Sequence, residues 1–193
     1  MYGGLESRLD DLLTELELEY YLAYAGLKES LELSRIYSKY SDLFGADLAR
    51  EALDLLGRSR DPRDLNLAGH LVLEYLDRLV SDLTDRAVTE EIGTRVEVDG
   101  RRYTLRAAMA ALSREPDRGL RSRIYRAVVG SIERRINPIL EERLGRVHGA
   151  ARDLGLRCYY LWVYDPRRCR GKALDQMVEG RDYELVRLHE LWR

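Results

Sequence analysis

The residues best suited to acid–base or metal chemistry are histidines, and the chain has only three of them: His70, His148 and His189. His70 and Glu74 stand four residues apart, a spacing that places two side chains on one face of a helix, where both could bind a metal ion. Their neighbours in sequence are aliphatic, and no second pair completes a ligand set. A hydrogen bond on a helix surface is therefore the preferred interpretation of this pair.

His148 offers no better metal site. It follows Glu141 by two helical turns, and Arg152, one turn further on, competes for the same carboxylate. Di-iron and di-manganese bundles require Glu-x-x-His on two helices. The residues three positions before the histidines are Leu67, Gly145 and Val186. The sequence therefore does not predict a di-metal bundle.

The zinc-peptidase motif H-E-x-x-H is also missing from the sequence. The chain ends in His189-Glu190-Leu191-Trp192-Arg193, where an arginine, which cannot bind zinc, stands at the second ligand position. No nucleophile elbow occurs, and Gly3-Gly4 does not follow a strand as a phosphate-binding loop would. We predict no catalytic, cofactor-binding or metal-binding residues in these 193 positions.

Composition limits the classes of function further. Lys and Arg number 32 against 34 Asp and Glu, and this near balance argues against a dedicated nucleic-acid binder or a polybasic membrane anchor. No apolar run approaches the roughly 18 residues that cross a bilayer, and residues 1–8 lack a signal core. Cys158 and Cys169 form no metal or disulfide pattern and are interpreted as free thiols. We expect a cytoplasmic protein without nucleic-acid or membrane partners.

Almost every basic residue is an arginine, and the arginines occur in groups. Such groups bind phosphates or carboxylates, but interleaved acids such as Asp117, Glu133, Glu141 and Glu142 favour solvated faces with salt bridges. The grouped positions are Arg118, Arg121, Arg123 and Arg126, then Arg134 and Arg135, then Arg167, Arg168 and Arg170.

Five of the 13 tyrosines also lie close together in the sequence. They are open to interpretation as a peptide-stacking or hydroxyl-donating surface, but their helical spacing favours positions at the edge of the core. These tyrosines are Tyr20, Tyr21, Tyr24, Tyr37 and Tyr40.

Apolar residues recur at intervals of three and four along most of the chain, as in amphipathic helices. The spacing predicts a long helix from Leu5 to Leu27 and two shorter helices that end at Gly45 and Gly57. A further long helix is predicted to begin at Asp61-Pro62 and to continue to Ile92.

The spacing changes at residues 95–105, where alternating residues flank the turn pair Asp99-Gly100 and predict a β-hairpin that lies against the helices. A short helix follows through Met109 and Leu112, and Pro116-Asp117 begin the next helix. Pro138 is compatible with a kink or with a new helix that ends at Gly155.

These patterns predict a mainly α fold, a bundle-like array of antiparallel helices with one small β-hairpin. Residues 1–155 are predicted to form one helical domain, and residues 156–193 a divergent aromatic and helical tail that packs on it. Within the tail, Tyr159 to Tyr164 are ambiguous between helix and strand, and a last helix carries Leu185, Leu188 and Trp192.

The succession of motifs resembles that in the N-terminal helical region of zinc oligopeptidases of the oligoendopeptidase F and thimet oligopeptidase family. The resemblance covers about residues 8 to 160, and the last thirty or so residues depart from the pattern. The motifs that carry it are Ile36-Tyr37-Ser38-Lys39-Tyr40-Ser41-Asp42-Leu43-Phe44, Val96-Glu97-Val98-Asp99-Gly100-Arg101-Arg102-Tyr103-Thr104-Leu105, Glu115-Pro116-Asp117-Arg118 with Arg121, Asn137-Pro138 and Ala151-Arg152-Asp153-Leu154-Gly155.

The resemblance implies a wall of a peptide-binding channel, while zinc and its H-E-x-x-H helix belong to a following region that this sequence does not contain. We therefore expect a non-catalytic domain whose partners are short peptides or a zinc-bearing catalytic domain. Three explanations of this departure from the family pattern remain open: a natural truncated relative, an excised domain, or a chain whose tail has diverged into a new interface. The alternative is a helical interaction protein, a homodimer among the possibilities, with Tyr159 to Tyr164 as the contact.

Overall fold

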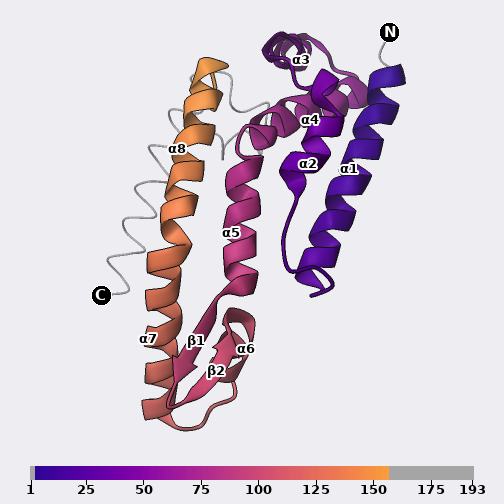
Figure 1. Cartoon of the computed structure of the whole chain (residues 1–193). Coiled ribbons are helices and arrows are strands. Elements are labelled where there is room, and N and C mark those ends of the chain that lie inside the picture. Colours follow the sequence, from indigo (N-terminus) through magenta and orange to yellow (C-terminus); the bar gives the residue numbers. More distant parts are fainter. Residues whose placement is uncertain (1–2, 157–193) are drawn as a thin grey trace. The chain divides into compact units, whose positions relative to one another are not determined.

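The structure is a computed structural model that describes residues 3–156. It is mainly helical and contains one two-stranded antiparallel hairpin, which confirms the predicted fold class (Figure 1). The described residues form two compact units. Residues 3–44 and 77–147 belong to the first unit, and residues 45–76 and 148–156 belong to the second. None of the helices in this part of the chain has an apolar stretch long enough to cross a membrane.

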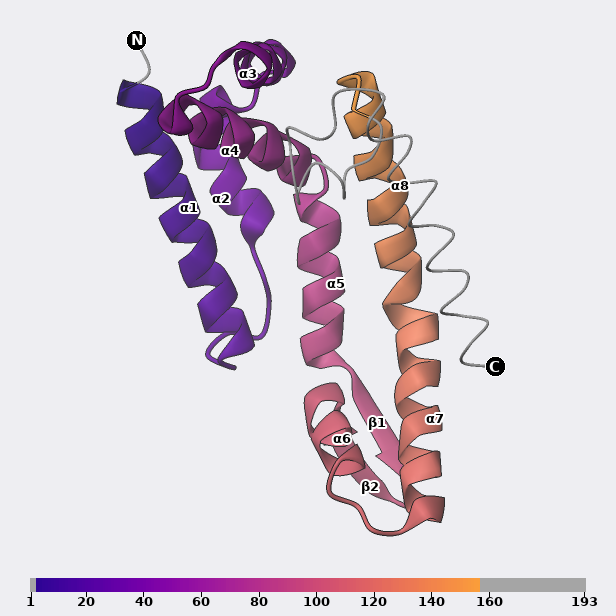
Figure 2. The same ribbon diagram turned by 180° about the vertical axis from the view of Figure 1, so that it is seen from behind.

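Three helices form one part of the first unit. α1 (Gly3–Tyr24) is followed by α2 (Leu33–Lys39), which runs back beside it, and α2 lies between α1 and α5 (Ser81–Gly93) (Figure 1, Figure 2). A short 3-10 helix, η1 (Ser41–Leu43), continues from α2. Most of the apolar stripe predicted for this helix faces the core, which confirms the helix, but its predicted end at Leu27 is wrong, because α1 ends at Tyr24 and both Tyr24 and Leu27 are exposed. The buried members of the stripe include Leu9, Leu12, Leu16 and Ala23.

The other part of this unit is built around the hairpin. β1 (Arg95–Val98) pairs with β2 (Arg101–Thr104), α6 (Leu105–Leu112) follows directly, and α7 (Arg118–Arg135) packs on both α6 and β1. The arrangement confirms that the hairpin lies against helices. It buries one continuous apolar cluster, made of Val96, Val98, Leu105, Ala108, Ile124, Val128 and Ile136.

Short polar residues define the turns of this part. Asp99 and Gly100 both have positive φ, 53° and 77°, as a tight hairpin turn requires. Thr104 caps α6 by accepting a hydrogen bond from the Ala107 amide, and Asp117 caps α7 through the Gly119 amide. The predicted start of α7 is therefore confirmed, with a side-chain cap as the physical cause.

Pro138 lies in the first turn of a new helix and does not kink a continuous one, which decides between the two alternatives that the sequence left open. α7 ends before Ile136, and α8 (Asn137–Asp153) begins with Pro138 in its first turn, where the missing amide proton costs nothing. Gly155 has a φ of 78° and the Leu156 amide donates back to the Ala151 carbonyl, which confirms the predicted helix end.

The second unit contains α3 (Ala46–Arg58) and most of α4 (Pro62–Arg78). Asp61 accepts a hydrogen bond from the Arg63 amide at 2.8 Å, so the predicted start at Asp61-Pro62 is confirmed. The apolar faces of the two helices are buried. They include Ala49, Ala52, Leu53, Leu67, Ala68 and Leu71.

The prediction of one continuous helix from residue 62 to residue 92 is wrong. α4 ends at Arg78 and α5 begins at Ser81, because Val80 leaves the helical region with φ −124° and ψ 11°. Its amide donates to the Asp77 carbonyl three residues back, and the Ser81 hydroxyl donates to the Arg78 carbonyl. Val80 is fully buried. The apolar spacing therefore continues through the break and does not reveal it.

Two predicted helix ends are also wrong. Gly45 has φ −81° and ψ 140° and precedes α3 as its N-cap, whereas α2 already ends at Lys39. Gly57 lies inside the last turn of α3, which ends at Arg58. Neither glycine adopts the left-handed conformation that makes glycine favourable after a helix.

Thr94, between α5 and β1, is fully buried, and its hydroxyl has no hydrogen-bond partner within the described residues. Because valine has nearly the same shape, Thr94→Val is expected to raise the free energy of unfolding by about 1 kcal/mol. Urea denaturation measures the change. Thr104→Val, which removes the cap of α6, is the matched control and is expected to lose about 1 kcal/mol. Equal losses in both variants would contradict the prediction.

Candidate functional site

An open groove lies between α1 and α2 in the first unit. It has a volume of about 220 Å³ and is lined by both apolar and charged residues. Leu18, Leu22 and Ile36 supply its apolar surface. Its charged residues are Glu15, Glu19, Lys28, Glu32, Arg35 and Lys39.

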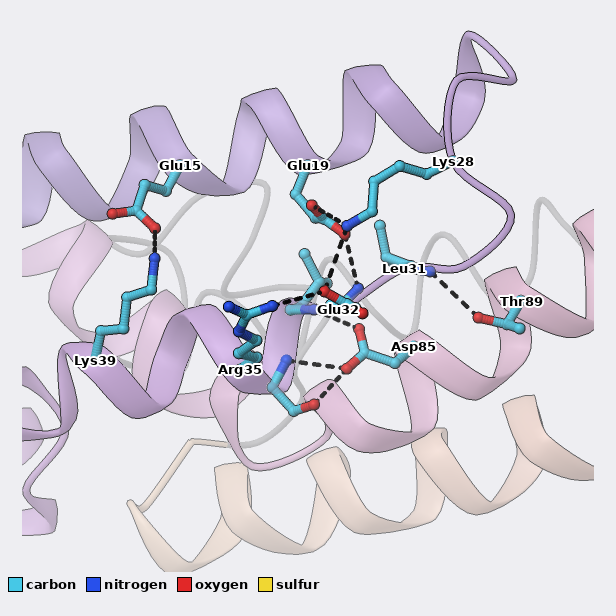
Figure 3. A network of polar contacts seen from close by, with 11 residues as sticks. Glu15, Glu19, Lys28, Leu31, Glu32, Arg35, Lys39, Asp85 and Thr89 are labelled. Atoms are coloured by element: carbon cyan, nitrogen blue, oxygen red, sulfur yellow. Dashed lines mark hydrogen bonds and ion pairs between the residues drawn. The ribbon is translucent and has the colours of Figure 1, made fainter.

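Glu15 occupies one end of this groove. It pairs with the Lys39 ammonium (Figure 3) and accepts a hydrogen bond of 2.9 Å from the Tyr40 hydroxyl. The hydrogen bond from Lys39 is the main cause that holds the pKa of Glu15 below its ordinary value. The pKa of Tyr40 is raised, first by burial and then by its hydrogen bond to Glu15. This end of the groove thus presents a satisfied ion pair.

Glu19 occupies the middle of the groove and is 8% exposed. Both of its carboxylate oxygens accept hydrogen bonds from Lys28 Nζ, at 2.7 and 2.8 Å. Glu32 Oε2 approaches the same ammonium at 3.4 Å. The hydrogen bond that Lys28 donates to Glu19 is the largest of the effects that raise the pKa of Lys28. Lys28 is therefore held as a cation at neutral pH.

Four successive backbone amides, those of residues 31–34, donate to side chains of α1 and α5 (Figure 3). Leu31 donates to Thr89 Oγ1 at 3.3 Å, and Glu32 to Glu19 Oε1 at 2.9 Å. Asp85 then accepts from Leu33 at 2.6 Å and from Ser34 at 3.0 Å.

Asp85 acts as the N-cap of α2 although it belongs to α5. The chain's own residue at that position, Glu32, makes no side-chain cap hydrogen bond. A run of amides that starts a helix attracts anions. Here the protein's own side chains, the carboxylates of Glu19 and Asp85 and the hydroxyl of Thr89, accept the hydrogen bonds of these amides. The amides therefore hold α2 in place between α1 and α5.

This arrangement is suited to binding and not to proton transfer. The carboxylates of Glu15, Glu19 and Asp85 each already accept hydrogen bonds from cations, hydroxyls or amides. The Arg35 side chain, 78% exposed, makes only a weak 3.4 Å contact to Glu32. A groove lined by both apolar and charged side chains favours a ligand that carries both apolar and charged groups.

The histidines weighed as candidate ligands lie on different helices in the described residues, His70 on α4 and His148 on α8. His70 and Glu74 lie one turn apart in α4, where His70 is half-buried, Glu74 is buried, and no hydrogen bond reaches His70 Nδ1 within residues 3–156. The predicted competition of Arg152 for Glu141 is wrong, because its Nε donates to the backbone carbonyl of His148 at 3.3 Å. His189 lies outside the described residues.

Three of the five grouped tyrosines confirm the core-edge prediction. Tyr37 is 4% exposed, and Tyr20 and Tyr40 are half-buried. Tyr21 and Tyr24, in the last turn of α1, are exposed instead. The ring of Tyr24 stacks on that of Tyr20, with 6.2 Å between centroids.

The salt-bridge prediction for the grouped arginines is wrong for most of the described ones. Arg123 pairs with Asp99 and Arg135 with Glu90. Of the acids named in the prediction, Glu142 pairs with Arg146, whereas Asp117 caps α7 and neither Asp117 nor Glu133 pairs with an arginine of the described residues. In residues 3–156 the side chains without an ion pair include Arg118, Arg121, Arg126 and Arg134, while Arg167, Arg168 and Arg170 lie outside that range.

Sequence reasoning missed Glu19 and Asp85, although the sequence carries a signal for both. Glu19 continues the stripe of Leu12, Leu16 and Ala23, and a charged residue at a buried helical position requires a partner. Asp85 likewise falls between the buried Ser81 and Val88 at intervals of four and three.

No group of three or more His, Cys, Asp or Glu in the described part of the chain is placed to hold a metal ion. Comparisons of the chain with protein-family models, with curated proteins and with solved structures find no match.

Proposed function

We propose that this chain is a substrate-binding helical domain like the channel wall of a zinc oligopeptidase, with short peptides as ligands and no complete active site of its own. The groove between α1 and α2 is the observation that carries the proposal, since it joins an apolar surface to charges of both signs. Peptides present alternating side chains and charged termini, which such a surface complements. The sequence resemblance supports the same class.

The order of elements gives further support. The helices, the hairpin, the short α6 and the Pro-Asp start of α7 follow one another in the order on which the resemblance rests. Catalysis would then require a zinc-bearing chain or region that supplies H-E-x-x-H, because the described groove contains acids and bases that are already paired.

Fluorescence anisotropy with a library of labelled short peptides tests the proposal. Leu18→Glu places a charge in the groove and is expected to weaken peptide binding at least about tenfold. Leu27→Glu is the matched control, since Leu27 is similarly exposed but does not line the groove, and it is expected to bind as the wild type does.

Hydrolysis is measured on the same samples, with and without zinc and with the H-E-x-x-H region of an oligoendopeptidase F added. We expect no cleavage by the chain alone. Cleavage by the chain alone that a chelator abolishes would overturn the proposal, and so would peptide binding that Leu18→Glu and Leu27→Glu leave equally unchanged.

Self-association is a second candidate function, favoured by exposed apolar side chains in and after the last turns of α1. Tyr21 is 64% exposed, and Leu18, Tyr24 and Leu27 are also exposed. A second copy would bury this surface. Sedimentation velocity of the wild type and of Tyr21→Glu separates self-association from peptide binding. A wild-type dimer that is lost in Tyr21→Glu would favour self-association. The contact predicted at Tyr159 to Tyr164 lies outside the described residues.

A further inference from the structure

Charge is strongly segregated along this chain, which the overall net charge of −2 conceals. Residues 95–135, the hairpin with α6 and α7, contain eleven arginines, no lysine and five acidic residues, a net charge of +6. Residues 1–94 contain ten basic and twenty acidic residues, a net charge of −10. A surface of one sign attracts partners of the opposite sign at distances well beyond contact.

Within the described residues, most guanidinium groups of the hairpin segment pair with no carboxylate. Eight of these arginines are exposed, and we call five of them, from β2, the segment before α7 and α7 itself, the arginine surface. Arg126 only donates to the Ser122 carbonyl of its own helix. The members are Arg101, Arg102, Arg114, Arg118 and Arg126.

Arg101 and Arg102 start β2 and Arg118 starts α7, toward one end of the hairpin segment, whereas Arg126 lies two turns further along α7. Figure 1 and Figure 2 show the hairpin turn and the start of α7 together at that end, and Arg123 of α7 contacts Asp99 of the turn at 2.8 Å. Arg101 and Arg102 follow the turn directly. Exposed apolar surface accompanies them, because Tyr125 of α7 is 58% exposed.

We propose that the arginine surface is a docking site for an acidic polypeptide segment of a partner protein. Guanidinium groups bind carboxylates through two parallel hydrogen bonds, and a surface built from arginine alone fits that recognition better than a lysine surface does. Tyr125 adds an aromatic contact of the kind found at protein interfaces.

Charge on the remainder of the same unit favours a polypeptide over a nucleic acid. α1 belongs to this unit and carries six acidic residues against one arginine, Arg8. An extended polyanion would meet this repulsion, whereas a short acidic segment satisfies the arginines locally. The proposal does not depend on the peptide groove, whose lining residues all belong to the segment before residue 40.

Binding of fluorescein-labelled octaglutamate, followed by anisotropy, tests this inference. The double variant Arg118→Glu/Arg126→Glu is expected to weaken binding at least about tenfold, and high salt should weaken binding by the wild type. The control Arg58→Glu/Arg60→Glu changes the net charge equally in the other compact unit and is expected to retain wild-type affinity.

Folding of the double variant is checked by circular dichroism. A glutamate at position 118 suits the first turn of α7, so a loss of helix is not expected. Equal losses in both double variants, or no binding of octaglutamate by the wild type, would overturn the inference. Tighter binding of an oligonucleotide of equal charge would also overturn it, in favour of a nucleic acid.

Discussion

Asp85→Ala is expected to lower the free energy of unfolding by about 3 kcal/mol. The variant removes the carboxylate that accepts from the Leu33 and Ser34 amides and from the Ser34 hydroxyl. Asp85 is only 9% exposed, so water replaces these hydrogen bonds poorly, and the start of α2 loses its cap. Urea denaturation followed by circular dichroism measures the loss.

Two further variants separate capping from charge. Asp82→Ala, on the same helix, removes an exposed partner of Arg146 and is expected to cost less than about 1 kcal/mol. Asp85→Asn retains one carbonyl oxygen as an acceptor and is expected to fall between the two. If Asp85→Ala costs no more than Asp82→Ala, the cap does not determine the position of α2.

Much of the fold was predictable because local signals determine it. The stripe of α1, the Asp99-Gly100 turn and the Asp117 start of α7 each depend on residues close in sequence. The break between α4 and α5 was not predictable in this way. Val80 is apolar and buried at the break, as it would be in a continuous helix. Only the tertiary arrangement therefore distinguishes a broken helix from a continuous one.

The candidate groove was less predictable than the fold, for a physical reason. Its lining comes from α1, the segment after it and α2, and the amides that position α2 bind a residue 52 positions later, Asp85. A helical pattern reports which residues are buried but does not report which helix lies opposite. The search for histidine ligands could not find a site whose polar residues are glutamates, lysines and backbone amides.

Glu19→Gln is expected to lower the free energy of unfolding by about 2 kcal/mol at neutral pH. The amide retains an oxygen for the Glu32 backbone N–H but presents its own N–H groups to the Lys28 ammonium. Glu17→Gln is the matched control, because Glu17 is exposed on the same helix, and it is expected to have no measurable effect.

The pH dependence of the stability difference between the wild type and Glu19→Gln tests whether Lys28 is the partner of Glu19. The pKa of Lys28 is raised in the folded protein, above the ordinary value of 10.5. The ion pair therefore contributes fully below the pKa of the unfolded chain, and the contribution is lost as the pH rises through the higher folded value. The stability difference between wild type and Glu19→Gln should consequently narrow above about pH 10. Tyrosines titrate there in both proteins, so only the difference is diagnostic. A difference that stays constant to high pH, or no coupling with Lys28→Gln in a double-mutant cycle, would show that Glu19 stabilises the turn through the Glu32 amide alone.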